Sequence, residues 1–183
     1  MKFAMILALV AAPAFAECPA PQDNSRELLN LIAKAQGAEN FSDGRRISSK
    51  MWEVWLRAPD EIAQSALDAG LRRRDSYDFA GALKEFERLV TYCPAYAEGY
   101  NQRAYIHFLR EDYAKALPDL DAALERNPHH IAAQSGRALT LMNLGRIKEA
   151  RAQMLIAVDN NPWLSEKALL GEGAPLGPAG KDI

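Results

Sequence analysis

The chain has few of the residues that build catalytic and metal sites. Its 183 residues include only two cysteines and three histidines, and no C-x-x-C pair, Gly-rich phosphate loop or G-x-S-x-G motif occurs. A zinc site needs three or four convergent ligands. The neighbours His129 and His130 are expected to be solvated in a turn, and His107 to be packed. We therefore expect no enzyme activity, no catalytic residue, no metal and no cofactor.

An excess of charge of one sign is also lacking. The chain has 22 Lys and Arg residues against 24 Asp and Glu residues, for a formal net charge of −2. Domains that bind nucleic acid carry a strongly basic face, so nucleic acid is not an expected partner.

Apolar runs are short as well. None reaches the roughly 18 residues that a membrane-spanning helix needs, so we expect no membrane span.

The first sixteen residues, MKFAMILALVAAPAFA, have the composition of a targeting segment. A lysine precedes an apolar run, and the small-x-small triplet AFA follows Pro13 and ends at Ala16. This order is typical of a secretory signal peptide. We predict a signal peptide over 1–16, cleavage after Ala16, and a mature chain that is periplasmic or secreted. Cys18 raises the alternative of a lipoprotein, but the residue before it is Glu17, not the small residue that such signals need.

Proline recurs at an interval of 34 residues in the second half of the chain. The prolines of this series are Pro94, Pro128 and Pro162. A fixed period of this size is the signature of a repeat architecture. Because proline cannot continue a helix, each of these prolines would end the second helix of one unit. We therefore predict three repeats within 63–164, with the boundaries 63–96, 97–130 and 131–164.

Aligned in this register, the three segments share small and large apolar positions. Small residues at the eighth and twentieth positions are Gly70, Ala104 and Ala138, then Ala82, Ala116 and Ala150. Large apolar residues at the seventeenth and twenty-fourth positions are Phe79, Tyr113 and Ile147, then Phe86, Leu120 and Met154. Small residues let two antiparallel helices approach closely, and large ones fill the space beside the contact. The pattern predicts helical hairpins that stack on one another.

This pattern resembles the tetratricopeptide repeat family in its period, its small and large positions and its proline. The phrases YNQRAYIHFLREDYAKAL and LMNLGRIKEA are similar to the helix-turn-helix of that family. The resemblance implies an all-α fold, a solenoid of helix-turn-helix repeats, and a non-enzymatic protein-interaction module or scaffold. Four positions depart from the family. Ala66 replaces a common large aromatic residue, Arg73 replaces a common Tyr, Gln134 stands at the position of Tyr100, and Pro118 falls inside the second helix of the middle repeat, where a slight kink is expected.

The resemblance also implies a binding surface, because such solenoids bind peptides on the concave side, which the first helix of each repeat lines. Positions two, five, nine and twelve share that face by their spacing. Asn101 suits a peptide backbone because one amide group both donates and accepts. The predicted peptide- or protein-binding residues are Leu67, Leu71, Asn101, Tyr105, Phe108, Ser135, Leu139 and Met142. In the alternative, some of these side chains pack on neighbouring helices.

One binding mode of the family is not expected here. Its chaperone-binding members hold a C-terminal carboxylate with Lys, Asn and Arg side chains at set positions. The matching residues are Leu67, Leu71, Gln102, Ala132 and Gly136. None of them is Lys, Arg or Asn, so we expect no binding of chaperone tails.

Residues 17–62 are predicted to form an N-terminal helical lead-in or cap. A helix over 25–35 places apolar residues on one face, and a loop follows. A second helix within 47–59 ends before Pro59 and carries Trp52 and Trp55 on one face. The two tryptophans either grip a ligand or cover the open face of the first repeat, as terminal elements of solenoids do. An alternative function is that of a structural accessory subunit of an envelope complex, a homo-oligomer through this Trp52/Trp55 helix.

The other end, 165–183, is predicted to be a short capping helix and then a disordered tail from Gly171 onward, because the tail is rich in Gly and Pro.

Within the repeats, Arg103 and Arg137 recur at the seventh position. They form either an anion site or structural contacts, with the head group on a carboxylate or carbonyl. We predict the structural role.

The two cysteines leave two interpretations. A reactive Cys93 would need a histidine within reach, and the repeat register gives no reason for one to be there. An exported compartment instead favours disulfides, and the only possible partner within the chain is Cys18. We predict a disulfide between Cys18 and Cys93, which would contribute about 3–4 kcal/mol in the chain-entropy model.

Overall fold

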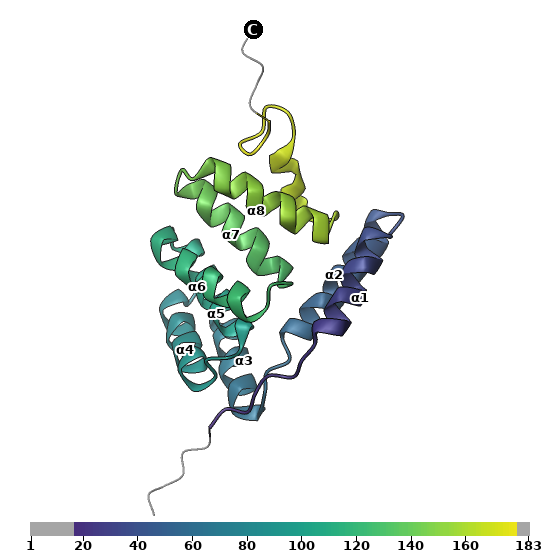
Figure 1. Ribbon diagram of the computed structural model, residues 1–183. Helices are drawn as coiled ribbons and strands as arrows, with labels where there is room; N and C mark the ends of the chain where they lie inside the picture. The colour runs from purple at the N-terminus through teal and green to yellow at the C-terminus, as the bar shows by residue number, and fades with distance from the viewer. Residues whose placement is uncertain (1–16, 179–183) are drawn as a thin grey trace, which may run out of the picture.

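The computed structural model describes residues 17–178, and the predicted signal peptide lies outside the described residues. Within 17–178 the chain is all-helical, with eight α-helices, one 3-10 helix and no strand (Figure 1). None of these helices is long and apolar enough to cross a bilayer. The helices are α1 (Ser25–Gln36), α2 (Phe41–Trp55), α3 (Glu61–Asp75), α4 (Phe79–Tyr92), α5 (Ala97–Leu109), α6 (Tyr113–Arg126), α7 (Ile131–Asn143), α8 (Ile147–Asn160) and η1 (Ser165–Leu170).

Helices α3 to α8 form three antiparallel hairpins that stack in sequence (Figure 1). The small residues do what the register predicts. Gly70 lies directly on the ring of Phe86 with no room for a Cβ atom, and Phe86 is fully buried. The aligned alanines from Ala82 to Ala150 are fully buried as well. The predicted all-α solenoid of helix-turn-helix repeats is confirmed.

Aspartate side chains cap the first two repeat helices. Asp60 Oδ1 accepts a hydrogen bond from the Ala63 backbone N–H at 2.8 Å, and Asp78 Oδ1 accepts one from the Gly81 N–H at 2.9 Å. Each bond satisfies a donor that has no partner within its own helix. The caps therefore fix where α3 and α4 begin.

The Asp60 cap makes stability depend on pH. The Ala63 N–H, and after it the Tyr92 hydroxyl at 2.7 Å, hold the pKa of Asp60 below its usual value. A lowered pKa means that the carboxylate stabilises the fold above its unfolded pKa of about 3.9, and that this contribution is lost as pH falls through the folded pKa. We expect urea unfolding between about pH 5 and pH 2 to show a smaller loss of stability in Asp60→Asn than in the wild type. Asparagine still caps but does not titrate, so equal losses would contradict this role.

The N-terminal hairpin differs from its prediction in where α2 begins. A loop was expected over 36–46, but the loop spans only 37–40, because α2 already starts at Phe41. Asn40 caps it by accepting a hydrogen bond from the Asp43 N–H at 3.0 Å. Gly44 obscured this helix in the sequence, since glycine is a poor helix former. Glycine is required at this position because a Cβ atom at residue 44 would collide with the ring of Trp163.

The same hairpin also lies elsewhere than predicted. It does not cover the open face of the first repeat but runs along one side of the stack, over the turns that follow the repeat prolines (Figure 1). The Tyr96 hydroxyl donates to the Trp55 carbonyl at 2.6 Å, and Trp163 Nε1 donates to the Ala35 carbonyl at 2.8 Å. The His130 ring stacks on Trp55 with centroids 4.4 Å apart. Aromatic residues after each repeat proline therefore hold the hairpin in place.

Both ends of the described chain are fixed to the repeats. The structure joins Cys18 to Cys93 in a disulfide with a Cα–Cα distance of 5.2 Å, as predicted. At the other end, the prediction of disorder is wrong for 171–178. Leu176 is fully buried against the last repeat, and its N–H donates to the Leu169 carbonyl at 2.9 Å. Burial of the Leu176 side chain therefore orders this segment although its composition is rich in Gly and Pro.

Candidate functional site

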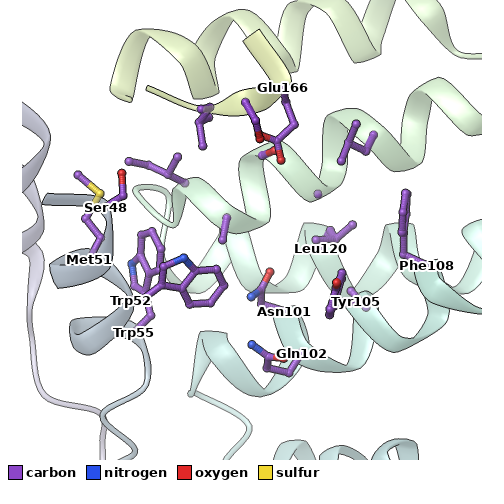
Figure 2. A pocket seen from close by; sticks show the side chains of 18 of the residues that line it. Ser48, Met51, Trp52, Trp55, Asn101, Gln102, Tyr105, Phe108, Leu120 and Glu166 are labelled. Carbon is purple, nitrogen blue, oxygen red and sulfur yellow. The ribbon is translucent and has the colours of Figure 1, made fainter. Parts of the chain in front are cut away.

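A groove of about 1040 Å³ lies between α2 and the first helices of the second and third repeats (Figure 2). One wall is α2, which contributes Ser48, Met51 and Trp52. The other wall is formed by α5 and α7, with Asn101 and Ser135 among its lining residues. The position of α2 thus gives the first helices of the second and third repeats an opposite wall, and the two walls bound the groove.

Five of the eight predicted binding residues line this groove. They are Asn101, Tyr105, Phe108, Ser135 and Leu139. The other three do not line it. Leu67 is fully buried in the core of the first repeat, where Leu71 also packs, and Met142 packs on the core of the last repeat. Leu67 and Leu71 belong to the apolar cluster that also contains Cys93 and Tyr96, so their helical position in the first repeat does not place them in the groove.

The two tryptophans of α2 have different environments. Both tryptophans line the groove, but Trp52 is 38% exposed, whereas Trp55 is only 6% exposed. Their rings meet edge to face with centroids 5.2 Å apart. Figure 2 places both on one side of the groove, with Asn101 and Tyr105 on the other. The sequence left open whether Trp52 contacts a ligand or covers a repeat. Its large aromatic side chain on a predicted helix was the feature that pointed to a binding role.

A buried polar network lies beneath the groove at the start of α5. The Glu98 carboxylate is 1% exposed and accepts hydrogen bonds from Asn101 Nδ2 at 3.1 Å, Gln102 Nε2 at 2.5 Å and His130 Nε2 at 2.6 Å. His130 Nδ1 accepts the Ala133 N–H at 3.3 Å, so Nε2 is the nitrogen that carries the proton. The bond to Glu98 orients the Asn101 amide, and within residues 17–178 no group donates a hydrogen bond to its Oδ1.

Burial of His130 corrects the expectation of a solvated turn. The side chain is 1% exposed, while its neighbour His129 is half-buried. Adjacent residues in a turn point in different directions, and His130 points at Trp55 and Glu98. Its role is to link α2 to the repeats beside the groove.

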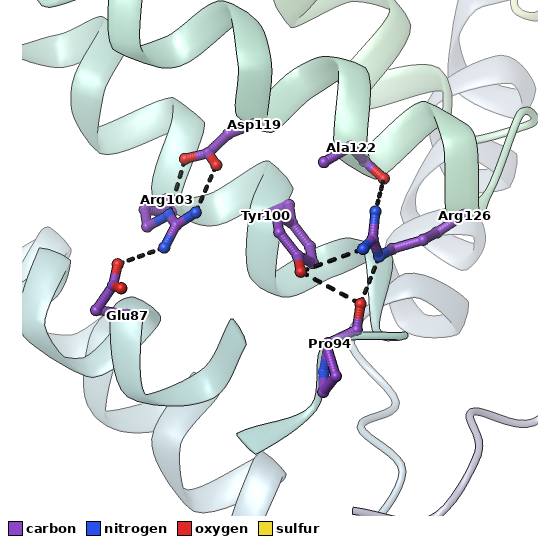
Figure 3. Close-up of polar contacts among 7 residues, drawn as sticks. All are labelled: Glu87, Pro94, Tyr100, Arg103, Asp119, Ala122 and Arg126. Carbon is purple, nitrogen blue, oxygen red and sulfur yellow. Dashed lines mark hydrogen bonds and ion pairs between the residues drawn. The ribbon is translucent and has the colours of Figure 1, made fainter. Parts of the chain in front are cut away.

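The recurring arginines make structural contacts, as predicted. Arg103 binds Asp119 with two hydrogen bonds of 2.8 and 2.6 Å and also pairs with Glu87 (Figure 3). The bond to Asp119 raises the pKa of Arg103. Arg137 donates to Asp121 Oδ1 at 2.6 Å. Each arginine head therefore already has a carboxylate partner.

The groove offers hydrogen bonds and aromatic contacts rather than reactive groups. Its charged lining residues are Arg45, Arg74, Asp75 and Glu166, two of each sign. Within residues 17–178, no three His, Cys, Asp or Glu side chains are grouped so that they could hold a metal ion. This chemistry suits the binding of a ligand.

Comparison with known proteins identifies the repeats. Two family models described as tetratricopeptide repeat match residues 67–128 and 107–162. A tetratricopeptide repeat protein 36 homolog of Nematostella vectensis is 39% identical over 64 residues, which is 35% of each chain. A TPR repeat-containing protein of Rhizobium etli is 36% identical over 64 residues, or 35% of this chain and 31% of that one. The match therefore spans about a third of the length of these curated relatives.

Solved structures share the fold at low sequence identity. The first TPR of Spaghetti, bound to the HSP90 peptide SRMEEVD, has a TM-score of 0.58 and 18% identity and covers 59% of this chain and 86% of its own. The TPR2B domain of yeast Sti1 in complex with pHsp70 has a TM-score of 0.55 and 19% identity and covers 62% and 90%. MamA has a TM-score of 0.50 and 20% identity and covers 76% and 79%. These likenesses agree on a helical repeat solenoid.

Proposed function

We propose that this chain, which contains tetratricopeptide repeats, is a protein-interaction module that binds an extended segment of a partner protein in the groove. The observation that carries the proposal is the two-walled groove, with Trp52 38% exposed on one wall and Tyr105 46% exposed on the other. Exposed aromatic side chains in a concave site are typical of interaction surfaces. Two of the structures with this fold hold HSP90 or Hsp70 ligands, which adds support.

The compartment that we propose is the periplasm of a Gram-negative bacterium. Residues 1–16 have the order of charged, apolar and small residues that a signal peptide has. The Cys18–Cys93 disulfide suits an oxidising compartment.

The proposed ligand is not a chaperone tail. Leu67, at one of the family's carboxylate-binding positions, is fully buried. At another, Gln102 donates to Glu98 and accepts from Arg74 at 3.0 Å. A segment bound here would be held along its length rather than by a terminal carboxylate. Homo-oligomerisation through α2 has less support, because Trp55 is buried within the chain.

A crosslinked pull-down from an envelope fraction tests the groove. We expect a variant that combines Asn101→Ala with Tyr105→Ala to bind its specific partners about thirtyfold more weakly than the wild type and to recover correspondingly less of them, since truncating an interface anchor costs about 2 kcal/mol. Leu155→Ala is the matched control, because Leu155 is 47% exposed on α8 and does not line the groove. Equal recovery of every partner by all three proteins would remove the groove as the binding site.

A further inference from the structure

We infer that the segment held in the groove is uncharged and places a large apolar side chain against Trp52. On this inference the N-terminal hairpin sets specificity, together with the repeats. It rests on the proposed function and adds the chemistry of the ligand to it. The charge of the lining, the packing of Trp52 and the buried polar atoms each support one part of it.

The four charged residues that line the groove within residues 17–178 are two of each sign, so the lining has no excess charge that would favour a charged ligand. Arg74 donates to Asp75 at 2.7 Å and to Gln102 Oε1 at 3.0 Å. The Arg45 guanidinium lies over the Phe41 ring, 5.7 Å from its centroid. A charged side chain brought into the groove would lose hydration without gaining a dominant counter-charge. A neutral segment avoids that cost.

The Trp52 ring is positioned by contacts with buried aromatic neighbours. Its ring packs edge to face on Trp55, and Trp55 in turn stacks on the buried His130. An aromatic group held by buried neighbours loses little conformational entropy when a ligand binds. Across the groove, Tyr105 is exposed as well, with the Arg74 guanidinium 5.9 Å from its ring centroid. A large apolar side chain on the ligand gains most from burial against these rings.

The buried polar atoms of the lining favour a polypeptide over a hydrocarbon chain. Ser135 is 4% exposed and Thr140 is fully buried, and both line the groove. Within residues 17–178 neither hydroxyl has a hydrogen-bond partner, and the same holds for Trp55 Nε1. Unpaired buried polar groups are costly. An extended peptide carries an N–H and a C=O on nearly every residue, which can pair with the amide of Asn101 in the groove lining, whereas an acyl chain offers no such partner.

A random library of short peptides, acetylated and amidated so that the ends carry no charge, tests the inference. The oxidised protein is immobilised, and the composition of the retained peptides is compared with the input by mass spectrometry. We expect enrichment of Trp, Phe, Leu and Met and depletion of Asp, Glu, Lys and Arg. Trp52→Ala is expected to lower the aromatic enrichment about fivefold, and Trp52→Phe to retain most of it. Unchanged thermal unfolding by circular dichroism verifies that both variants fold.

The outcomes separate this inference from the proposed function. A retained pool rich in charged residues, or enrichment that Trp52→Ala leaves unchanged, overturns the inference. The groove function still stands in that case if Tyr105→Ala lowers total retention. Retention by the wild type no higher than by the Asn101→Ala, Tyr105→Ala double variant overturns both. A parallel arm uses a fluorescent fatty acid, and binding of this probe with no peptide retained overturns the assignment of a peptide ligand.

Discussion

Replacing Cys93 by serine is expected to lower the free energy of unfolding by about 3–4 kcal/mol. The disulfide to Cys18 closes a loop of 75 residues, and opening it returns that conformational freedom to the unfolded chain. The loop contains the whole N-terminal hairpin together with α3 and α4. Urea unfolding followed by circular dichroism measures the loss.

Two controls separate the crosslink from local packing at Cys93, which is 1% exposed. Cys18→Ser is expected to cost about as much as Cys93→Ser, and the double variant no more than either, because all three remove the same bond. Reducing the wild type with a thiol reagent is expected to reproduce the loss. A double variant as stable as the wild type would mean that the bridge adds nothing to stability.

The repeats could be predicted because their determinants are local and periodic. Pro94 and its two equivalents each lie two residues past the last residue of a helix, and Gly70 and the aligned alanines mark close helix contacts. The face of α1 was predictable for the same reason. Its residues at helical spacing, Leu28, Leu31, Ile32 and Ala35, are all buried.

The position of the N-terminal hairpin could not be predicted in this way. It depends on contacts such as the one between Trp163 and Ala35, which are separated by 128 residues. Glycine at position 44 leaves room for the ring of Trp163, but it also weakens the helical pattern of α2 in the sequence. The start of α2 was therefore missed because of a contact with a residue far away in the chain. The burial of Leu176 could not be predicted either, because no pattern near it in the sequence indicates the surface on which it packs.

The candidate site was therefore predictable only on the repeat side. Asn101, Tyr105 and Ser135 followed from their repeat positions, and all three line the groove. The opposite wall, with Trp52, depends on where the hairpin lies. A helical face predicts which side chains point the same way along one helix, but it does not predict which second element completes a groove.

The buried network beneath the groove gives the other large effect. Glu98→Ala is expected to lower the free energy of unfolding by about 3–5 kcal/mol, because it leaves buried hydrogen-bonding groups without their charged partner. The stranded donors would be Asn101 Nδ2, Gln102 Nε2 and His130 Nε2. Since His130 stacks on Trp55, the loss would also loosen α2 from the repeats.

Glu87→Ala is the matched control for Glu98→Ala. Glu87 also pairs with a basic group, Arg103, but its side chain is 65% exposed. Exposed ion pairs contribute about 0–1 kcal/mol, so urea unfolding should separate the two variants clearly. Retention of the random peptide library should fall in Glu98→Ala even under conditions where the variant is folded, because Asn101 loses the partner that orients it. Equal stability of the two variants would contradict a supporting role for Glu98, and unchanged retention would mean that Asn101 is oriented by other contacts.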